Sequence, residues 1–186
     1  MIISQLHTLL ICRDQTLTDD IQVVLGKTFP DMQVDICLIW DEQLLTPDSP
    51  GYDLVILDQQ ADDPAPLASL RQIKAARPTV PVMMLIDLAT EELVEEAQAA
   101  QVDSFLLKTP KVLSRLPANV RHLFETRQRK NRLQTSEAKL RMIFEHAFDG
   151  ISIYEELPEI GSRRLIDCNE RYAEMAGRSR AELLSI

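Results

Sequence analysis

Three charged side chains follow apolar runs of the sequence at points where a phosphoryl site could form. Asp14 comes shortly after LLIC, Asp58 follows DLVIL, and Lys108 follows SFLL. Two carboxylates suit a hard cation such as Mg²⁺, which prefers oxygen ligands. A carboxylate also serves as a nucleophile, and a lysine neutralises the charge of an added phosphoryl group. These residue types predict a small site for Mg²⁺ and phosphate, provided that the fold brings them together.

The elements that would position these residues are short strands alternating with amphipathic helices. The runs that read as strands are 7–12, 33–39, 53–57, 80–86 and 104–108. Between them, LTDDIQVVLGKTF, PLASLRQIKAARP and TEELVEEAQAA repeat apolar residues at helical spacing. The pattern predicts an α/β fold with a flavodoxin-like, doubly wound, five-stranded parallel sheet in the order 2-1-3-4-5. The connection WDEQLLTPDSPG leaves room for about one helical turn.

In that strand order the ligand crevice lies beyond the carboxyl ends of strands 1 and 3. Asp14 and Asp58 should therefore face one crevice, and Lys108 has the reach to approach it. The alternative for Asp58 is a helix cap or a solvated loop carboxylate. Lys108 taken by itself reads as an ordinary surface lysine, so the constellation rather than any single residue predicts the site.

The pattern changes near Pro117, which predicts three parts: a domain at 1–118, a helical linker at 119–146 and a further domain at 147–186. The linker sequence has apolar clusters at both ends and a polar middle. After it the pattern reads as strand, hairpin, strand and short helices. Ser179 and Glu182 form a capping box for the last of these helices.

Composition narrows the classes of function. Residues 1–118 hold 18 acidic and eight basic side chains, which argues against nucleic-acid binding there. We read the basic run within 119–141 as a solvated helix face. No apolar run has the length of a membrane span, and the three cysteines form no CxxC pair, so we expect reduced thiols in the cytoplasm.

Residues 5–125 resemble a response-regulator receiver domain, through LLICRDQ, YDLVILD, VPVMMLID and AAQVDSFLLKTP. The resemblance implies that Asp58 is the phosphoacceptor and Lys108 the lysine that contacts the phosphoryl group. It implies that Asp14 and Asp58 bind Mg²⁺ together with the backbone carbonyl of Gln60. Phe105 would be the aromatic switch residue, although a plain core role is equally compatible with its position.

The same comparison exposes departures from the family pattern. Arg13 stands where the family usually has the first of two acids, which would make Mg²⁺ binding weak or absent, or would let the arginine occupy the phosphate site itself. Ile86 replaces the Ser or Thr that usually hydrogen-bonds the phosphoryl group. Thr109 separates Lys108 from Pro110, so we expect a trans peptide after Lys108 rather than a cis bond before proline. Together these features resemble a degenerate receiver.

Residues 137–186 resemble the N-terminal half of a PAS domain, through SEAKLRMIFEHAFDGISIYE and LIDCNERYAEMAGRSRAELL. Receiver and PAS modules joined by a helix are typical of bacterial sensory proteins with histidine kinase or diguanylate cyclase outputs. Neither output is encoded here, so we expect no enzyme activity of these residues. The resemblance does not identify a PAS ligand.

The sequence therefore predicts a signal-transduction module of the two-component type, with Asp58 as its candidate phosphoacceptor and a PAS sensor coupled through the helix. A histidine kinase or phosphotransfer protein would be the partner if Asp58 is phosphorylated. The apolar clusters of the linker helix would either form a homodimer or pack on the chain's own two domains; they are Val120–Leu123–Phe124 and Leu133–Leu140–Ile143–Phe144. The alternative is a phosphorylation-independent pseudo-receiver that acts only in dimerisation or protein interaction. A nucleotide-binding enzyme is disfavoured because CRDQTLTDD has no glycine for a phosphate loop.

Overall fold

The computed structural model describes residues 6–40, 51–60, 63–158 and 162–185. It divides into two compact units, Met1–Arg127 and Gln128–Ile186. We describe each unit separately.

The N-terminal unit is built on a five-stranded parallel sheet in the order β2-β1-β3-β4-β5, as the sequence predicts. The strands are β1 (Leu6–Ile11), β2 (Met32–Cys37), β3 (Leu54–Gln59), β4 (Val82–Ile86) and β5 (Ser104–Leu107). Every residue of β3 and β4 is buried, because helices cover both faces of the sheet. The predicted helical turn between β2 and β3 falls in 41–50, outside the described residues.

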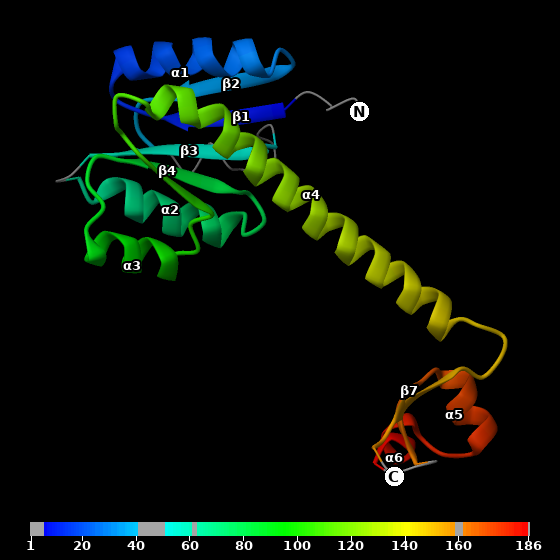
Figure 1. Cartoon of the computed structure of the whole chain (residues 1–186). Helices are drawn as coiled ribbons and strands as arrows, with labels where there is room; N and C mark the ends of the chain where they lie inside the picture. Colours follow the sequence, from blue (N-terminus) through cyan, green and yellow to red (C-terminus); the bar gives the residue numbers. More distant parts are fainter. Residues whose placement is uncertain (1–5, 41–50, 61–62, 159–161, 186) are drawn as a thin grey trace. The chain divides into compact units, whose positions relative to one another are not determined.

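Two helices cover each face of the sheet (Figure 1). The helices are α1 (Gln15–Thr28), α2 (Ala65–Ala76), α3 (Glu91–Ala99) and α4 (Val112–Glu145). Ile21 of α1 and Leu116 of α4 belong to one core cluster, whereas Ile73 of α2 and Ala97 of α3 belong to the other. The helical spacing of these apolar residues places them on the sheet-facing side, so the two layers enclose the sheet.

Helix α4 starts earlier than the predicted linker. It begins at Val112 rather than at 119, and it contains Pro117, which lacks the N–H that the carbonyl of Leu113 would normally accept from. Val120 and Leu123 are buried in the core of the N-terminal unit. The burial of Val112 and Leu116 as well explains why the helix does not start at the change in sequence pattern.

The C-terminal unit contains a two-stranded antiparallel sheet and two short helices. They are β6 (Ser152–Glu156), β7 (Arg163–Cys168), α5 (Glu170–Ala176) and α6 (Arg180–Leu184). The capping box of Ser179 and Glu182 is present at the start of α6. The order of elements agrees with the sequence pattern, and the tip of the hairpin, 159–161, lies outside the described residues.

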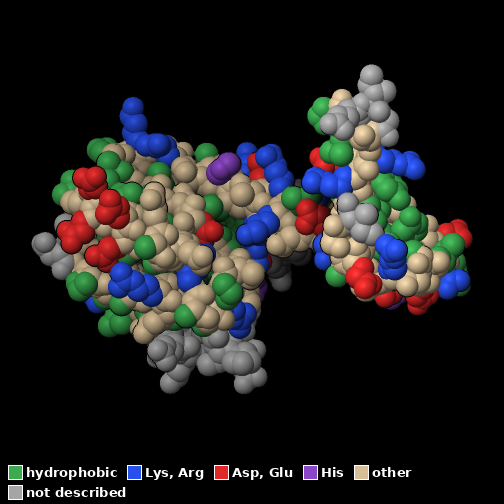
Figure 2. Space-filling view, turned by 90° about the horizontal axis from the view of Figure 1, so that it is seen from below, with side chains coloured by type: hydrophobic (Ala, Val, Ile, Leu, Met, Phe, Trp, Pro, Cys, Tyr) green, Lys and Arg blue, Asp and Glu red, His purple; other side chains and the backbone are tan. Residues whose placement is uncertain are grey.

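On the face of the N-terminal unit that α2 and α3 form, α3 carries acidic side chains, whereas the charged residues of α2 are basic (Figure 2). Glu91 and Glu92 lie in the first turn of α3, where the N-terminal end of the helix dipole favours negative charge. None of the helices in the described part of the chain is both long and apolar enough to cross a membrane.

Candidate functional site

Asp58 and Lys108 form an ion pair at the carboxyl end of the sheet. The Nζ atom of Lys108 donates to Asp58 Oδ1 at 2.6 Å, and the Asp58 side chain is only 3% exposed. Asp58 lies in β3 and Lys108 directly follows β5, and β4 lies between these two strands in the sheet. The ammonium group explains how a strand buried on both faces can end in a carboxylate, because a buried charge needs a partner.

Lys108 has a second carboxylate partner, Asp87. Its Nζ atom lies 2.9 Å from Asp87 Oδ1, so the ammonium bridges two carboxylates. Asp87 comes directly after Ile86, the last residue of β4, and 43% of its side chain is exposed. Our sequence interpretation missed this residue, although its position at the carboxyl end of a central strand was a usable signal.

The pKa of Lys108 reflects two opposing effects. Burial by itself lowers the pKa, but hydrogen bonds and charges from Asp58 and Asp87 outweigh it, and the net pKa lies above the ordinary lysine value. Lys108 is therefore a protonated, permanent cation at neutral pH.

Cys12, which directly follows β1, lies next to Asp58. Its Sγ lies 3.5 Å from Asp58 Oδ2 and 3.4 Å from the backbone oxygen of Asp14, so the thiol can donate to either acceptor. Burial raises the pKa of Cys12, and the charge of Asp58 acts in the same direction, although a hydrogen bond with Thr18 lowers it. Sequence reasoning assigned no role to Cys12, because a thiol after an apolar strand usually reads as core.

Asp14 lines the same groove as Asp58 and Lys108, as predicted, but its carboxylate has a structural task. Its Oδ1 accepts from the backbone N–H of Leu17 at 3.1 Å, which makes Asp14 the N-cap of α1. The metal-binding role of Asp14 stays a prediction.

Arg13 forms an ion pair with Asp63 rather than with Asp58. Its Nη1 atom donates instead to Asp63 Oδ2 at 3.0 Å. The cation that pairs with Asp58 is therefore Lys108 and not Arg13. The reason is that Asp63, five residues beyond Asp58, presents a more accessible carboxylate at the rim.

Oxygen atoms that the receiver resemblance assigns to Mg²⁺ already have partners within the protein. The backbone oxygen of Gln60 already accepts from Gln59 Nε2 at 2.7 Å and from the N–H of Asp63 at 3.1 Å. Asp58 Oδ1 is held by Lys108, and the guanidinium of Arg13 lines the same groove. Within the described ranges no group of three or more His, Cys, Asp or Glu side chains is arranged to hold a metal ion.

The two switch positions of the sequence analysis lie in the sheet. Ile86 is 2% exposed and packs in the core cluster beside Leu57, so its side chain offers no hydrogen bond to a ligand. Phe105 is partly buried and packs against the same cluster, and its switch role stays a prediction. The peptide between Lys108 and Thr109 is trans, as expected.

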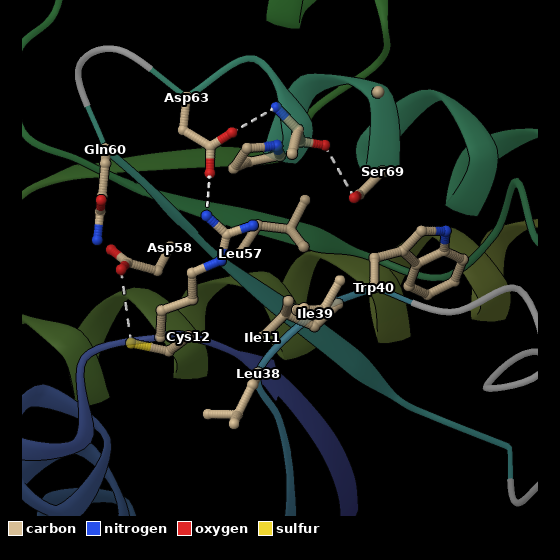
Figure 3. Close-up of a pocket in the computed structure, with 14 residues that line it drawn as sticks. Ile11, Cys12, Leu38, Ile39, Trp40, Leu57, Asp58, Gln60, Asp63 and Ser69 are labelled. Carbon is tan, nitrogen blue, oxygen red and sulfur yellow. Dashed lines mark hydrogen bonds and ion pairs between the residues drawn. The ribbon is translucent and has the colours of Figure 1, made fainter.

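Beside the polar groove lies a smaller, mostly apolar cavity of about 230 Å³ (Figure 3). Its walls come from the end of β1, the residues after β2, the end of β3 and the start of α2. Asp58 and Arg13 border both hollows. Trp40 lines this cavity and also packs against the core cluster that contains Leu57.

Comparisons with solved structures agree with the fold of the N-terminal unit. The response regulator DrrB of Thermotoga maritima, an OmpR/PhoB homolog, is 22% identical with a TM-score of 0.56. A CheY-like receiver domain protein of Methanospirillum hungatei is 19% identical, with a TM-score of 0.60, and the match covers 68% of this chain and 99% of that one. The orphan response regulator HP1043 of H. pylori is 21% identical with a TM-score of 0.55, over 64% of this chain and 97% of that one.

The N-terminal unit has the receiver fold. The match to DrrB covers 66% of this chain but 54% of DrrB, so the chain spans about half the length of that response regulator. No protein-family model matches the sequence, and comparison with curated proteins gives no match. Identities below a quarter establish the receiver fold alone, and they leave the chemistry of Asp58 to be argued from its contacts.

Proposed function

We propose that this chain is a receiver-type signalling module of the two-component kind that works without phosphoryl transfer to Asp58. The observation that carries the proposal is the second partner of Lys108: its ammonium, 2.6 Å from Asp58, also pairs with Asp87 at 2.9 Å, so both carboxylates are held by one cation of the protein. An internal ammonium supplies the positive charge that Asp58 requires when it is buried. The charge of Asp58 is thus paired with a cation of the protein itself, which Asp58 shares with Asp87.

Three further contacts support this proposal. The Cys12 thiol, rather than a second carboxylate, lies against the second oxygen of Asp58, at 3.5 Å. The Gln60 carbonyl is satisfied by protein donors, and Ile86 cannot hydrogen-bond a phosphoryl group. A phosphoryl group on Asp58 would therefore lack both a bound Mg²⁺ ion and a hydrogen bond from the residue at the end of β4.

Phosphorylation of Asp58 is the second candidate, favoured by one observation. Asp58 sits at the carboxyl end of β3 with a lysine on its side chain, which is the arrangement that the receiver resemblance implies. In that case a histidine kinase or phosphotransfer protein would be the partner, and Asp14 and Gln60 would have to release their present hydrogen bonds to bind Mg²⁺.

In either case we propose that the signal passes by contact rather than by catalysis, through α4 to a PAS-like C-terminal unit in the cytoplasm. Support comes from the continuity of α4 from Val112 to Glu145. Leu133, Leu140 and Ile143 are at least 60% exposed on this helix, which suits a homodimer contact. The other predicted dimer cluster, around Val120 and Leu123, packs in the core of the N-terminal unit instead.

A phosphorylation assay tests the proposal. The protein is incubated with acetyl phosphate and Mg²⁺, and the intact mass is measured, with a receiver domain that has both acidic residues as a positive control. We expect no added phosphoryl group on this chain. Phosphorylation that disappears in Asp58→Asn would overturn the proposal and establish the second candidate.

A further inference from the structure

Two apolar residues that line the cavity beside Asp58, Leu38 and Ile39, belong to neither hydrophobic core cluster. Leu38 and Ile39 are 56% and 63% exposed, yet both line the cavity together with Trp40 and Leu57 (Figure 3). Apolar side chains left in water around a concave space lose the stabilisation that burial would give them. A compact apolar group placed in the cavity would cover them.

One end of the cavity is polar. Asp58 lines this end, and among the described residues the hydrogen-bond partner of its Oδ2 atom is the Cys12 thiol, a weak donor at 3.5 Å. The opposite oxygen is taken by Lys108 at 2.6 Å. The second oxygen of this buried carboxylate can therefore accept a stronger hydrogen bond from a molecule in the cavity.

The charged side chains around the cavity and the adjoining groove determine which charge that molecule should carry. Four carboxylates border the two hollows, against two basic side chains; they are Asp14, Asp58, Asp63 and Asp87, against Arg13 and Lys108. Arg13 is further neutralised by Asp63 at 3.0 Å. The local field therefore favours a cation and disfavours an anion.

We propose that this cavity binds a small organic cation, an ammonium group attached to a compact apolar body. The ammonium donates to Asp58 Oδ2, and the apolar body lies between the β2 end and α2. The volume of about 230 Å³ is at the small end for ligand cavities, which limits the ligand to few heavy atoms. The inference rests on the proposed function, since a site without phosphoryl transfer needs another input.

Trp40 provides the test, because it is the only tryptophan of the chain and it lines the cavity. Its fluorescence is titrated with three probes of similar shape: phenethylammonium, 2-phenylethanol and phenylacetate. We expect saturable changes with the ammonium at millimolar concentration or below, and at least tenfold weaker binding of the alcohol and the carboxylate. Equal binding of all three, preference for the carboxylate, or no saturation with any probe would overturn the proposal.

A pair of variants on α2 locates the binding site. Ala68 lines the cavity and is exposed, so Ala68→Leu fills the space without disturbing the core. Ala75 is exposed on the same helix but does not line the cavity, so Ala75→Leu is the matched control. We expect Ala68→Leu to weaken ammonium binding at least tenfold and Ala75→Leu to leave it unchanged. Equal effects, or none from Ala68→Leu, would contradict the assignment.

Asp58→Asn tests the recognition of charge. This variant should bind phenethylammonium and 2-phenylethanol equally, because the carboxylate that distinguishes them is gone. Retention of the ammonium preference would overturn the role of Asp58. Failure of binding leaves the phosphorylation result of the wild-type chain unaffected, so the ligand inference and the proposed function fail separately.

Discussion

Arg127 of α4 contacts Asp53, the residue directly before strand β3, which contains Asp58. Its Nη1 atom donates to the backbone oxygen of Asp53 at 2.9 Å and lies 3.5 Å from Asp53 Oδ1. The other carboxylate oxygen of Asp53 accepts from the backbone N–H of His7 at 3.1 Å. Strand β3, which follows Asp53, therefore has the candidate site at one end and a contact with α4 at the other.

Removing this contact should loosen α4 near the boundary of the N-terminal unit. Arg127→Ala should lower the free energy of unfolding by about 1 kcal/mol, the typical contribution of one hydrogen bond. Backbone amides of α4 that follow residue 123 should exchange faster with deuterium. Arg121 is exposed on the same helix, so Arg121→Ala is the control. Unchanged exchange in Arg127→Ala would show that core packing alone fixes this part of α4.

The ion pair between Asp58 and Lys108 should be strongly coupled. Lys108→Met leaves a buried carboxylate with its main partner gone, which should cost about 3 kcal/mol of unfolding free energy. Asp58→Asn combined with Lys108→Met should restore part of that loss, which urea unfolding of the single and double variants would measure.

An exposed ion pair provides the control for this cycle. Arg71 and Glu96 lie 2.9 Å apart with side chains 58% and 45% exposed. Arg71→Met should change stability by less than about 0.5 kcal/mol. If Lys108→Met had an equally small effect, Asp58 would be stabilised by solvent rather than by the lysine.

The raised pKa of Lys108 fixes the pH range of this stabilisation. Because the folded pKa lies above the value of an unfolded lysine, the contribution is fully present below about pH 10.4 and is lost as pH rises through the folded pKa. The stability difference between wild type and Lys108→Met should stay constant from about pH 7 to about pH 9.5. Urea midpoints across this range would measure it, and a decline near neutral pH would contradict the bridge.

Much of this fold, and the pairing of Asp58 with Lys108, could be predicted from sequence. The alternation of strands and helices indicates the strand order of a parallel sheet, and in a parallel sheet the carboxyl ends of β3 and β5 lie at the same end. The partners of individual side chains could not be predicted in this way. Arg13 could have turned to Asp58 or to Asp63, and that choice depends on rotamers and loop geometry rather than on spacing.

The bridge to Asp87 and the contact of Cys12 were missed for a related reason. Asp87 is one position beyond the residue that the family comparison directs attention to, Ile86. Cys12 reads as core because a thiol is usually a small apolar side chain. In both cases local chemistry at the strand ends, rather than periodicity, determines the neighbours of Asp58.

Cys12 should be an unreactive thiol. Burial raises its pKa, with a further rise from Asp58, so the thiolate fraction at pH 8 should be below that of an ordinary cysteine. Iodoacetamide should modify Cys37, which is partly exposed, well before Cys12. Peptide mass mapping over time would measure both rates, and unfolding in urea should bring them together. Rapid modification of native Cys12 would mean that the cavity opens readily to reagents.

Asn169 should stabilise the C-terminal unit through four hydrogen bonds. Its Oδ1 accepts from the N–H groups of Ile151 and Tyr172, and its Nδ2 donates to the backbone oxygens of Phe144 and Asp149. Asn169→Ala leaves these buried groups unpaired and should cost about 2–3 kcal/mol. Hydrogen exchange should then accelerate at Ile151 and Tyr172.

Asn169→Asp keeps the acceptor, so it should preserve that protection better than Asn169→Ala. In Asn119→Ala, the control, only a bond to the Arg115 oxygen is lost. If Asn169→Ala behaved like this control, the loop before β6 would be held by packing alone.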